Sequence, residues 1–266
     1  MRRKSRERQF VKMGRNDLGV DLLVDDHRLR HHLSMAQKRV GEYFIGHEVS
    51  RLLRATEANI VLDVGANVGQ FAEGLRQSGY RGRIASFEPV AEPYARLSAA
   101  AASDDLWTTY PYALGAEDGT AEINRVPGTM SSMLPASEFG KRWSDKLQQQ
   151  TTETIQVRRL ESVVDEVTQG LDPVRAYLKM DTQGFDLQVF EGARAVLDRV
   201  VAMQSEASCV PIYDGMPRLP QQWATYEDAG FEAVGVYPVT RDKETLRAIE
   251  LDLVMVRPAE VRRPKA

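Results

Sequence analysis

A glycine-containing turn and an acidic side chain follow two consecutive predicted strands. In "NIVLDVGANVGQF", a short apolar run leads into Asp63, Gly65, Asn67 and Gly69, and Glu88 ends the next strand in "ASFEP". At Gly65 a side chain would block the close approach of a ligand, and the N–H groups of the turn favour a carboxylate or another electron-rich group. An acid at the tip of a second strand commonly accepts hydrogen bonds from ribose hydroxyls. We therefore expect these five residues to bind a cofactor that contains a nucleoside.

The composition of the turn narrows the choice of cofactor. The loop D-V-G-A-N-V-G matches neither G-x-G-x-x-G, the pyrophosphate fingerprint, nor the G-x-x-x-x-G-K-[ST] triphosphate loop. A nucleoside without a pyrophosphate fits better, and S-adenosylmethionine is the candidate. Its methionine carboxylate would lie at the Gly65–Gly69 turn and its ribose on Glu88. Ala113 and Leu114 end the third predicted strand, where an adenine ring lies in such folds, although core packing explains them nearly as well.

Three more acids end predicted strands and form a second candidate site: Asp181 in "LKMDTQG", Glu206 in "MQSEA" and Asp252 in "IELDLV". Asp181 and Glu206 converge beside the cofactor if their strands are neighbours, and Asp252 joins them only if its strand runs in a suitable direction. One interpretation is a Mg²⁺ site that lowers the pKa of an acceptor hydroxyl, because hard cations prefer carboxylate oxygens. In a second, Asp181 itself takes the proton. In a third, Asp181 caps the following helix and Glu206 bonds to backbone N–H groups. Asp181 is the catalytic candidate.

Strand and helix patterns alternate from residue 59 onward. Short apolar runs rich in β-branched residues predict buried strands, with helices between them that include 185–197 and 218–229. "LWTTYPYAL" is predicted as a third strand, whose Pro111 indicates an edge position or a strand end. Two extra strands, "GTAEINRV" and "TIQVRRL", flank a polar loop from about 127 to 151. The order predicts an α/β fold: a Rossmann-like, doubly wound, mostly parallel sheet with an antiparallel terminal hairpin, and with ligands at the carboxyl ends of its strands.

The patterns divide the 266 residues into three parts. Residues 59–258 form the alternating domain, and 259–266 form a C-terminal tail. Residues 1–58 are predicted as a basic tail, a short extended piece at "LGVDLLV" and a helical extension. The first fifteen residues contain seven Lys or Arg and one acid, which predicts a solvated terminus, with an arm that contacts phosphate or a membrane as the alternative.

Composition excludes several classes of protein. The formal net charge of −3 gives no reason to expect a nucleic-acid partner, and no apolar run is long enough to span a bilayer. One cysteine, Cys209, fits a reducing compartment. We expect a cytoplasmic protein without a membrane span, whose partner is a small-molecule or saccharide acceptor. The sequence leaves the oligomeric state open between a monomer and a homodimer.

The motifs together resemble a known family. "VLDVGANVGQFA", "ASFEPV", "YALGAEDGTAEI", "SSML" and "YLKMDTQGFDLQVFEGA", in this order, are similar to the FkbM-type family of S-adenosylmethionine-dependent O-methyltransferases, from about Asn59 to Pro258. The resemblance implies a class I methyltransferase fold. It also implies that Ser131 and Ser132 belong to a lid or an acceptor-binding segment. One departure is Gln183, where the family often has glutamate, and we expect this residue to contact the acceptor.

The resemblance and the two candidate sites predict methyl transfer from S-adenosylmethionine to a hydroxyl of a sugar or a specialised metabolite, with or without assistance from Mg²⁺. Two alternatives stay open. One is a nucleotide-dependent oxidoreductase of Rossmann type, against which the missing fingerprint argues. The other is a non-catalytic partner subunit that only binds a nucleoside.

Overall fold

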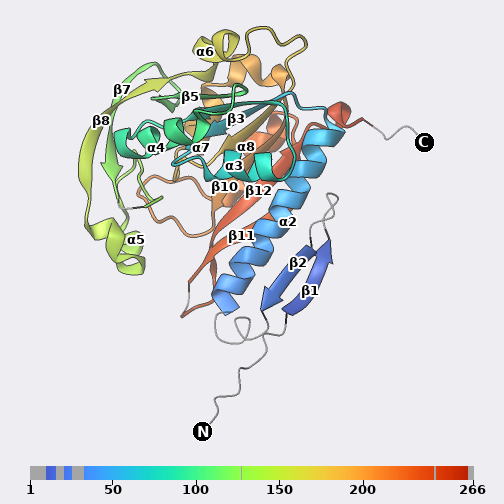
Figure 1. The fold of residues 1–266 in the computed structure, drawn as a ribbon. Coiled ribbons are helices and arrows are strands. Elements are labelled where there is room, and N and C mark those ends of the chain that lie inside the picture. Colours follow the sequence, from blue (N-terminus) through green and yellow to red (C-terminus); the bar gives the residue numbers. More distant parts are fainter. Residues whose placement is uncertain (1–9, 16–20, 26–32, 127, 243, 263–266) are drawn as a thin grey trace.

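The computed structural model describes residues 10–15, 21–25, 33–126, 128–242 and 244–262, with side chains from residue 44 onward. The largest unit of these described residues is a seven-stranded sheet (Figure 1). Its strands in spatial order are β11 (Glu232–Arg241), β12 (Ala248–Val256), β10 (Val200–Ser208), β9 (Ala176–Met180), β3 (Ile60–Val64), β4 (Arg83–Phe87) and β5 (Trp107–Tyr110). Within this described sheet, β12 runs antiparallel to both of its neighbours and the other pairings are parallel. The predicted mostly parallel sheet with an antiparallel terminal hairpin is confirmed.

The two central strands end at the residues predicted to do chemistry. All five residues of β3 and all five of β9 are buried, as their apolar sequences require. From β3 the chain moves outward to β4 and β5 and later returns across β3 to β9 and β10. The strand order therefore reverses between β3 and β9. In such sheets ligands bind at this reversal, beside the carboxyl ends of the strands.

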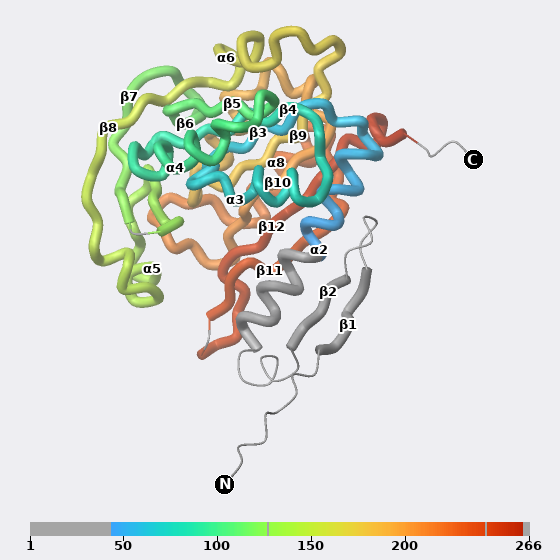
Figure 2. The backbone as a smooth tube through the Cα atoms, viewed as in Figure 1, coloured from blue at the N-terminus to red at the C-terminus, as the bar shows by residue number. Residues whose placement is uncertain are grey.

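Helices cover both faces of the sheet and enclose two apolar cores (Figure 1). One face carries α2 (Leu33–Ala55), α3 (Gln70–Gln77) and α4 (Ala91–Ala101), and the other carries α6 (Leu160–Val167), α7 (Asp186–Glu191) and α8 (Leu219–Asp228). Tyr177 of β9 packs in the core beneath α2, α3 and α4, and Leu178 packs in the core beneath α6, α7 and α8, because successive side chains of a strand point to opposite faces. Along the backbone, α2 lies beside β11 and β12 (Figure 2). Among the described helices, none is both long and apolar enough to cross a membrane.

A three-stranded sheet beside the main one changes two predictions. It consists of β6 (Ala113–Leu114), β8 (Thr151–Arg158) and β7 (Gly119–Arg125). The predicted third strand is therefore two strands in different sheets, because the chain breaks at Pro111 after the edge strand β5. The predicted polar loop contains a helix, α5 (Glu138–Trp143), and a 3-10 turn, Asp145–Gln148. The Ser137 hydroxyl caps α5 by accepting the Gly140 N–H at 3.0 Å.

The helix predicted over 185–197 is also divided. It forms α7 and a separate 3-10 helix, Arg194–Arg199. The division falls at Gly192, where a Cβ atom would lie 1.9 Å from the carbonyl oxygen of Gly115. The close approach of these two backbone segments ends α7, and the apolar periodicity of the sequence gives no sign of it.

The N-terminal region contains more structure than its charge predicts. β1 (Phe10–Arg15) pairs antiparallel with β2 (Asp21–Asp25), so residues 10–15 form a strand rather than part of a solvated tail. A partner strand a few residues away satisfies their backbone groups. Residues 1–9 of the basic tail and 263–266 of the C-terminal tail lie outside the described residues. At the predicted start of the C-terminal tail, a 3-10 turn (Pro258–Glu260) is tied to Arg175, the residue before β9, by an ion pair of 2.8 Å between Arg175 and Glu260.

Candidate active site

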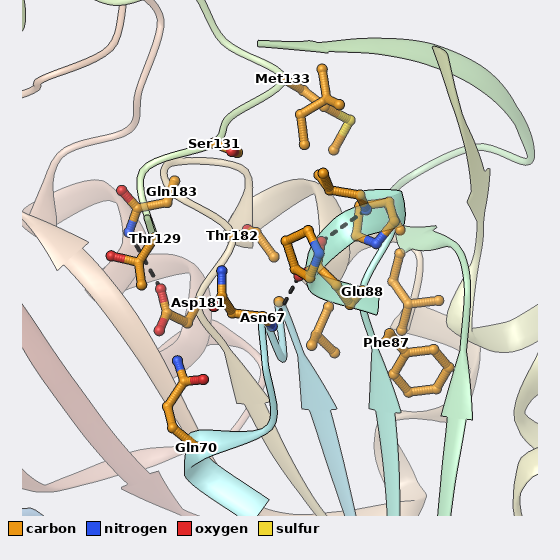
Figure 3. A pocket seen from close by; sticks show the side chains of 18 residues that line it. Asn67, Gln70, Phe87, Glu88, Thr129, Ser131, Met133, Asp181, Thr182 and Gln183 are labelled. Atoms are coloured by element: carbon orange, nitrogen blue, oxygen red, sulfur yellow. Dashed lines mark hydrogen bonds between the residues drawn. The ribbon is translucent and has the colours of Figure 1, made fainter. Parts of the chain in front are cut away.

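A cavity lies at the carboxyl ends of β3 and β4, beside the glycine turn (Figure 3). Seven of the residues predicted to bind cofactor or acceptor line it, together with Asp181: Gly65, Asn67, Glu88, Ala113, Leu114, Ser131 and Gln183. Apolar side chains from Phe87, Val90, Ile123 and Met133 form much of the remaining wall. A carboxyl group within an apolar wall suits a nucleoside, which has a flat ring and a hydroxylated sugar.

The turn after β3 holds an unusual backbone conformation. Gly65, Asn67 and Gly69 all have positive φ, at 75°, 50° and 93°. The N–H groups of Gly65 and Ala66 both donate to the Phe87 carbonyl, at 3.1 and 3.0 Å, which fixes the turn against the end of β4. Asn67 can adopt its left-handed conformation more easily than most residues other than glycine.

The reason for glycine at position 65 differs from the expected one. A Cβ atom there would lie 2.0 Å from the carbonyl oxygen of Asp181, so the glycine admits the backbone that follows β9 before it admits any ligand. At Gly69 a Cβ atom would lie 2.9 to 3.1 Å from Trp107 and Leu97, which is packing against β5 and α4. Gly69 does not line the cavity. The absence of a side chain at Gly65 therefore lets the ends of β3 and β9, which carry the site, lie in contact.

Glu88, the residue predicted to bind a sugar, follows β4 and lines the cavity. Its Oε2 accepts the Asn67 N–H at 2.9 Å and its Oε1 accepts the Val90 N–H at 2.8 Å. The side chain is only 5% exposed, and burial raises its pKa to about 7, although both hydrogen bonds act in the opposite direction. Each carboxylate oxygen can accept a second hydrogen bond. Glu88 is therefore held by the turn while facing the cavity.

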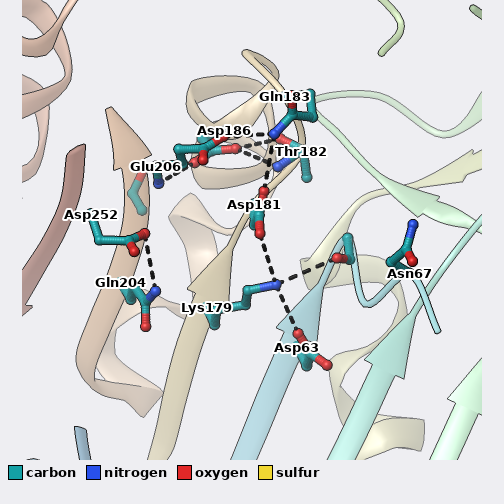
Figure 4. A network of polar contacts seen from close by, with 12 residues as sticks. Asp63, Asn67, Lys179, Asp181, Thr182, Gln183, Asp186, Gln204, Glu206 and Asp252 are labelled. Atoms are coloured by element: carbon teal, nitrogen blue, oxygen red, sulfur yellow. Dashed lines mark hydrogen bonds and ion pairs between the residues drawn. The ribbon is translucent and has the colours of Figure 1, made fainter. Parts of the chain in front are cut away.

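A buried lysine that the sequence analysis did not single out organises the site (Figure 4). Nζ of Lys179 lies 3.2 Å from Oδ1 of Asp63 and 3.5 Å from Oδ2 of Asp181. It also donates to the Gly65 carbonyl at 3.4 Å. The two carboxylates raise the lysine pKa and outweigh its burial, which acts to lower it. A single Lys in the apolar strand "AYLKM" was the available signal, because a charge in a strand buried on both faces requires a partner.

Asp63 has a different role from the predicted one. It is fully buried and does not line the cavity. Besides its pair with Lys179, its Oδ2 accepts a hydrogen bond from the Ser86 hydroxyl at 3.1 Å. Its contacts are thus with β4 and β9, and it fixes the lysine rather than touching a ligand directly.

The second acidic group lies on the same side of the sheet as α2 and α3 and lines a larger cavity of about 680 Å³. Asp181, Glu206 and Asp252 all contribute to its wall. Glu206 and Asp252 are register partners in the antiparallel pair β10–β12, so the reversed strand does bring Asp252 alongside. Burial is the main cause of a raised pKa at both, well above the usual value for Glu206 and to about 7 for Asp252. Asp181 and Gln70 line both cavities, so the two cavities are neighbours at these residues.

These three carboxyl groups do not form a cation site. Asp181 contacts Lys179 and Gln183, Glu206 accepts from Gln183 at 2.7 Å, and Asp252 accepts from Gln204 at 3.1 Å. Over the part of the chain that the structure describes, no group of three His, Cys, Asp or Glu side chains could hold a metal ion. A hard cation needs several oxygens free to converge. The arrangement gives no support to the predicted Mg²⁺.

Two further residues tie the loop after β9 to its neighbours. Asp186, fully buried, accepts hydrogen bonds from the backbone N–H groups of Thr182 and Glu206, at 2.9 and 3.0 Å. The interpretation in which the Glu206 carboxylate bonds to backbone N–H groups is not what the structure has: that carboxylate accepts from the Gln183 side-chain amide, and the Glu206 N–H donates to Asp186. The Ser132 hydroxyl donates to the Gln183 carbonyl at 2.7 Å, while the Ser131 hydroxyl accepts the Val126 N–H at 3.1 Å. Ser132 therefore fixes the loop, and Ser131 faces the cavity.

Known proteins resemble this chain in sequence and in fold. A model of the methyltransferase FkbM domain matches residues 63–232. Methyltransferase sdnD of Sordaria araneosa is 24% identical over 223 residues, which is 74% of this chain and 80% of that protein. The solved structure of methyltransferase FkbM from Methylobacillus flagellatus KT has a TM-score of 0.46 and 16% identity over 74% of this chain, which spans only 43% of that one. Magnesium protoporphyrin IX methyltransferase from Synechocystis PCC 6803, solved with bound S-adenosylmethionine, has a TM-score of 0.45 and 11% identity, covering 84% of this chain and 82% of that one. Because the matched domain spans well over half of its residues, the chain belongs to the methyltransferase FkbM domain family, with a class I methyltransferase fold.

Proposed function

We propose that the protein transfers a methyl group from S-adenosylmethionine to a hydroxyl oxygen of a sugar or a specialised metabolite. The observation that carries this proposal is the position of Asp181. This carboxylate, whose side chain is 39% exposed, lines both the smaller cavity beside Glu88 and the larger cavity beneath α2 and α3. A donor in the first and an acceptor in the second would meet at its carboxylate.

The smaller cavity suits the nucleoside half of the donor. Glu88 offers carboxylate oxygens to the two ribose hydroxyls, and Ala113 and Leu114 offer an apolar surface to the adenine. The amino-acid half would extend past Gln70 and Asp181 toward the larger cavity, leaving the remainder of that space to the acceptor.

Besides the binding surfaces, methyl transfer requires one protein group that accepts the proton of the acceptor hydroxyl. Bound S-adenosylmethionine supplies an activated methyl group on a positively charged sulfur. The acceptor oxygen would form the new carbon–oxygen bond while the methyl–sulfur bond breaks, S-adenosylhomocysteine would leave, and the hydroxyl proton would pass to the carboxylate of Asp181. Lys179, held by Asp63, forms an ion pair with that carboxylate and keeps it in place. The base form of the mechanism is preferred over the metal form because the carboxyl groups already have partners within the protein.

Turnover of S-adenosylmethionine to S-adenosylhomocysteine, measured with a panel of hydroxylated acceptors, tests the proposal. Asp181→Asn should lower kcat by roughly 10²- to 10⁴-fold, the usual contribution of a general base, with donor affinity changed by less than about threefold. Asp228→Asn, an exposed change of the same chemistry, should leave both unchanged. A chelator should have no effect.

The two alternative functions give different results. A silent binding subunit would bind the donor without forming S-adenosylhomocysteine with any acceptor. An oxidoreductase would bind a nicotinamide or flavin nucleotide and ignore S-adenosylmethionine. Equal loss of donor affinity and turnover in Asp181→Asn would assign the carboxylate to donor binding and remove it from catalysis.

A further inference from the structure

The side chain of Gln183 lies between two carboxyl groups (Figure 4). Its Nε2 donates to Oε2 of Glu206 at 2.7 Å and, in a longer contact, to Oδ1 of Asp181 at 3.4 Å. An amide nitrogen carries two hydrogens, and each carboxyl group has oxygens that accept, so one amide group can serve both acids. The neutral amide thus bridges the ends of β9 and β10.

Two hydrogen bonds anchor the bridge. The Gln183 backbone has a φ of 54°, a left-handed conformation that is uncommon outside glycine and needs support from its surroundings. Its carbonyl accepts the Ser132 hydroxyl at 2.7 Å, and its Oε1 accepts the hydroxyl of buried Tyr213 at 3.1 Å. Residues 51 positions before and 30 positions after Gln183 therefore fix the direction of its amide.

The bridge completes the orientation of Asp181. Oδ1 of Asp181 faces the Gln183 amide, and Oδ2 faces the Lys179 ammonium at 3.5 Å. A carboxylate with a donor beside each oxygen has little freedom to rotate. Its remaining lone pairs are open to the cavities, because the side chain is 39% exposed.

We propose that the Gln183 amide takes the place that a divalent cation would occupy between Asp181 and Glu206, and that Gln183 is a positioning residue for Asp181. Mg²⁺ binds oxygen ligands at about 2.0–2.1 Å in near-octahedral geometry. The amide presents N–H groups at that point, which repel a cation and fill its space. The role for Asp181 rests on the proposed function, whereas the exclusion of a cation does not.

Replacing the amide by a carboxylate of the same size tests this directly. Gln183→Glu places a third acid beside Asp181 and Glu206, so it should bind Mn²⁺ saturably with a Kd in the micromolar to low-millimolar range, measured by electron paramagnetic resonance titration. The wild-type chain should show no saturable binding at this site. The matched control, Gln183→Glu with Glu206→Gln, should weaken the gained binding by roughly tenfold or more, since it removes one ligand.

Several results would overturn the proposal. One is Mn²⁺ binding by the wild-type chain that Glu206→Gln abolishes. Another is a folded Gln183→Glu variant that gains no Mn²⁺ binding. Should repulsion unfold Gln183→Glu, Mn²⁺ should restore its melting transition, and failure to do so would count equally against the proposal.

The positioning role has a separate kinetic readout. Gln183→Leu keeps much of the volume but donates no hydrogen bond, so kcat should fall by roughly 10- to 100-fold while the KM for the donor changes by less than about threefold. Equal kcat for Gln183→Leu and wild type would overturn the positioning role. Mn²⁺ binding needs no turnover, so a chain that methylates no acceptor would defeat the proposed function and leave the cation experiment informative.

Discussion

At the scale of single residues, the partners of each buried acid determine what it can do. Asp63 and Glu88 end neighbouring strands and are both buried, yet Asp63 is paired with an ammonium group and Glu88 with two backbone N–H groups. The first pairing uses the acid to hold Lys179. The second leaves Glu88 facing a cavity, where it can accept hydrogen bonds from a ligand.

Glu88→Gln should weaken S-adenosylmethionine binding by about tenfold or more. Hydrogen bonds to a charged acceptor contribute about 1.5–3 kcal/mol each, and the amide retains only one acceptor oxygen. Isothermal titration calorimetry measures the change. Glu92→Gln, an exposed change in the first turn of α4, is the matched control and should have no effect. Unchanged affinity in Glu88→Gln would remove this residue from the donor site.

The same residue should make donor binding depend on pH. Burial raises the pKa of Glu88 to about 7, and the ionised form is the one that accepts both ribose hydroxyls. Donor affinity should therefore be weak below pH 6, rise through about pH 7 and level off above it. In Glu88→Gln the step should disappear, and its persistence would assign the pH dependence to another group.

At the scale of elements, the site depends on how closely two strand ends approach. Gly65, after β3, contacts the Asp181 carbonyl after β9 without space for a Cβ atom. The Gln183 bridge continues the same junction from β9 to β10. The reactive groups therefore belong to three adjacent parallel strands, and any change in their spacing should affect the site as a whole.

Gly65→Ala should lower the free energy of unfolding by about 2–4 kcal/mol. The reason is that position 65 has a left-handed φ of 75° and that the added Cβ would collide with Asp181. Gly74→Ala is the control, because its Cβ would meet nothing within 4 Å in the middle of α3. That change should stabilise the protein by up to about 1 kcal/mol through helix propensity. Urea unfolding compares them, and equal stability of the two variants would contradict the close approach seen here.

At the scale of the whole molecule, buried carboxyl groups concentrate at one end of the sheet. Glu250 of β12 is 5% exposed, and its Oε1 has no hydrogen-bond partner among the described residues. Burial, with the nearby charges of Asp181 and Asp252, raises its pKa to about 8. The folded state therefore binds this proton more tightly than the unfolded chain, whose glutamate has its ordinary pKa near 4.5.

This linkage sets the direction of the pH dependence of stability. The contribution of protonated Glu250 is fully present below about pH 4.5 and is lost as the pH rises toward 8. The glutamine in Glu250→Gln is always neutral. This variant should therefore reduce the decrease in unfolding free energy between pH 5 and 8 by on the order of 2 kcal/mol. Exposed Glu227→Gln should leave the slope unchanged. Parallel slopes for Glu250→Gln and wild type would contradict this account.

Much of the fold could be predicted from local patterns. The runs "NIVLDV" and "VRAYLKMD" predicted β3 and β9, because strands buried on both faces are apolar along their whole length. The family motifs added the fold class. Pro111 indicated the edge position and the end of β5, but the same patterns missed the division of the helix at Gly192, because that division depends on what the segment contacts. They also missed Lys179 and Asp186, whose partners come from other strands.

The sequence by itself determined the order of strands and helices, the glycine turn, the acids at the strand ends and the family, since each of these depends on residues that are close together in the sequence. The tertiary structure decided the partners of those acids: Lys179 meets Asp63 from 116 positions away, and Gln183 meets Glu206 across 23. The physical reason is that hydrogen bonding and desolvation act over a few ångströms of space, whatever the separation along the chain. A spacing in sequence can place a carboxylate at a strand end, but only packing decides whether a cation, an amide or a ligand lies beside it.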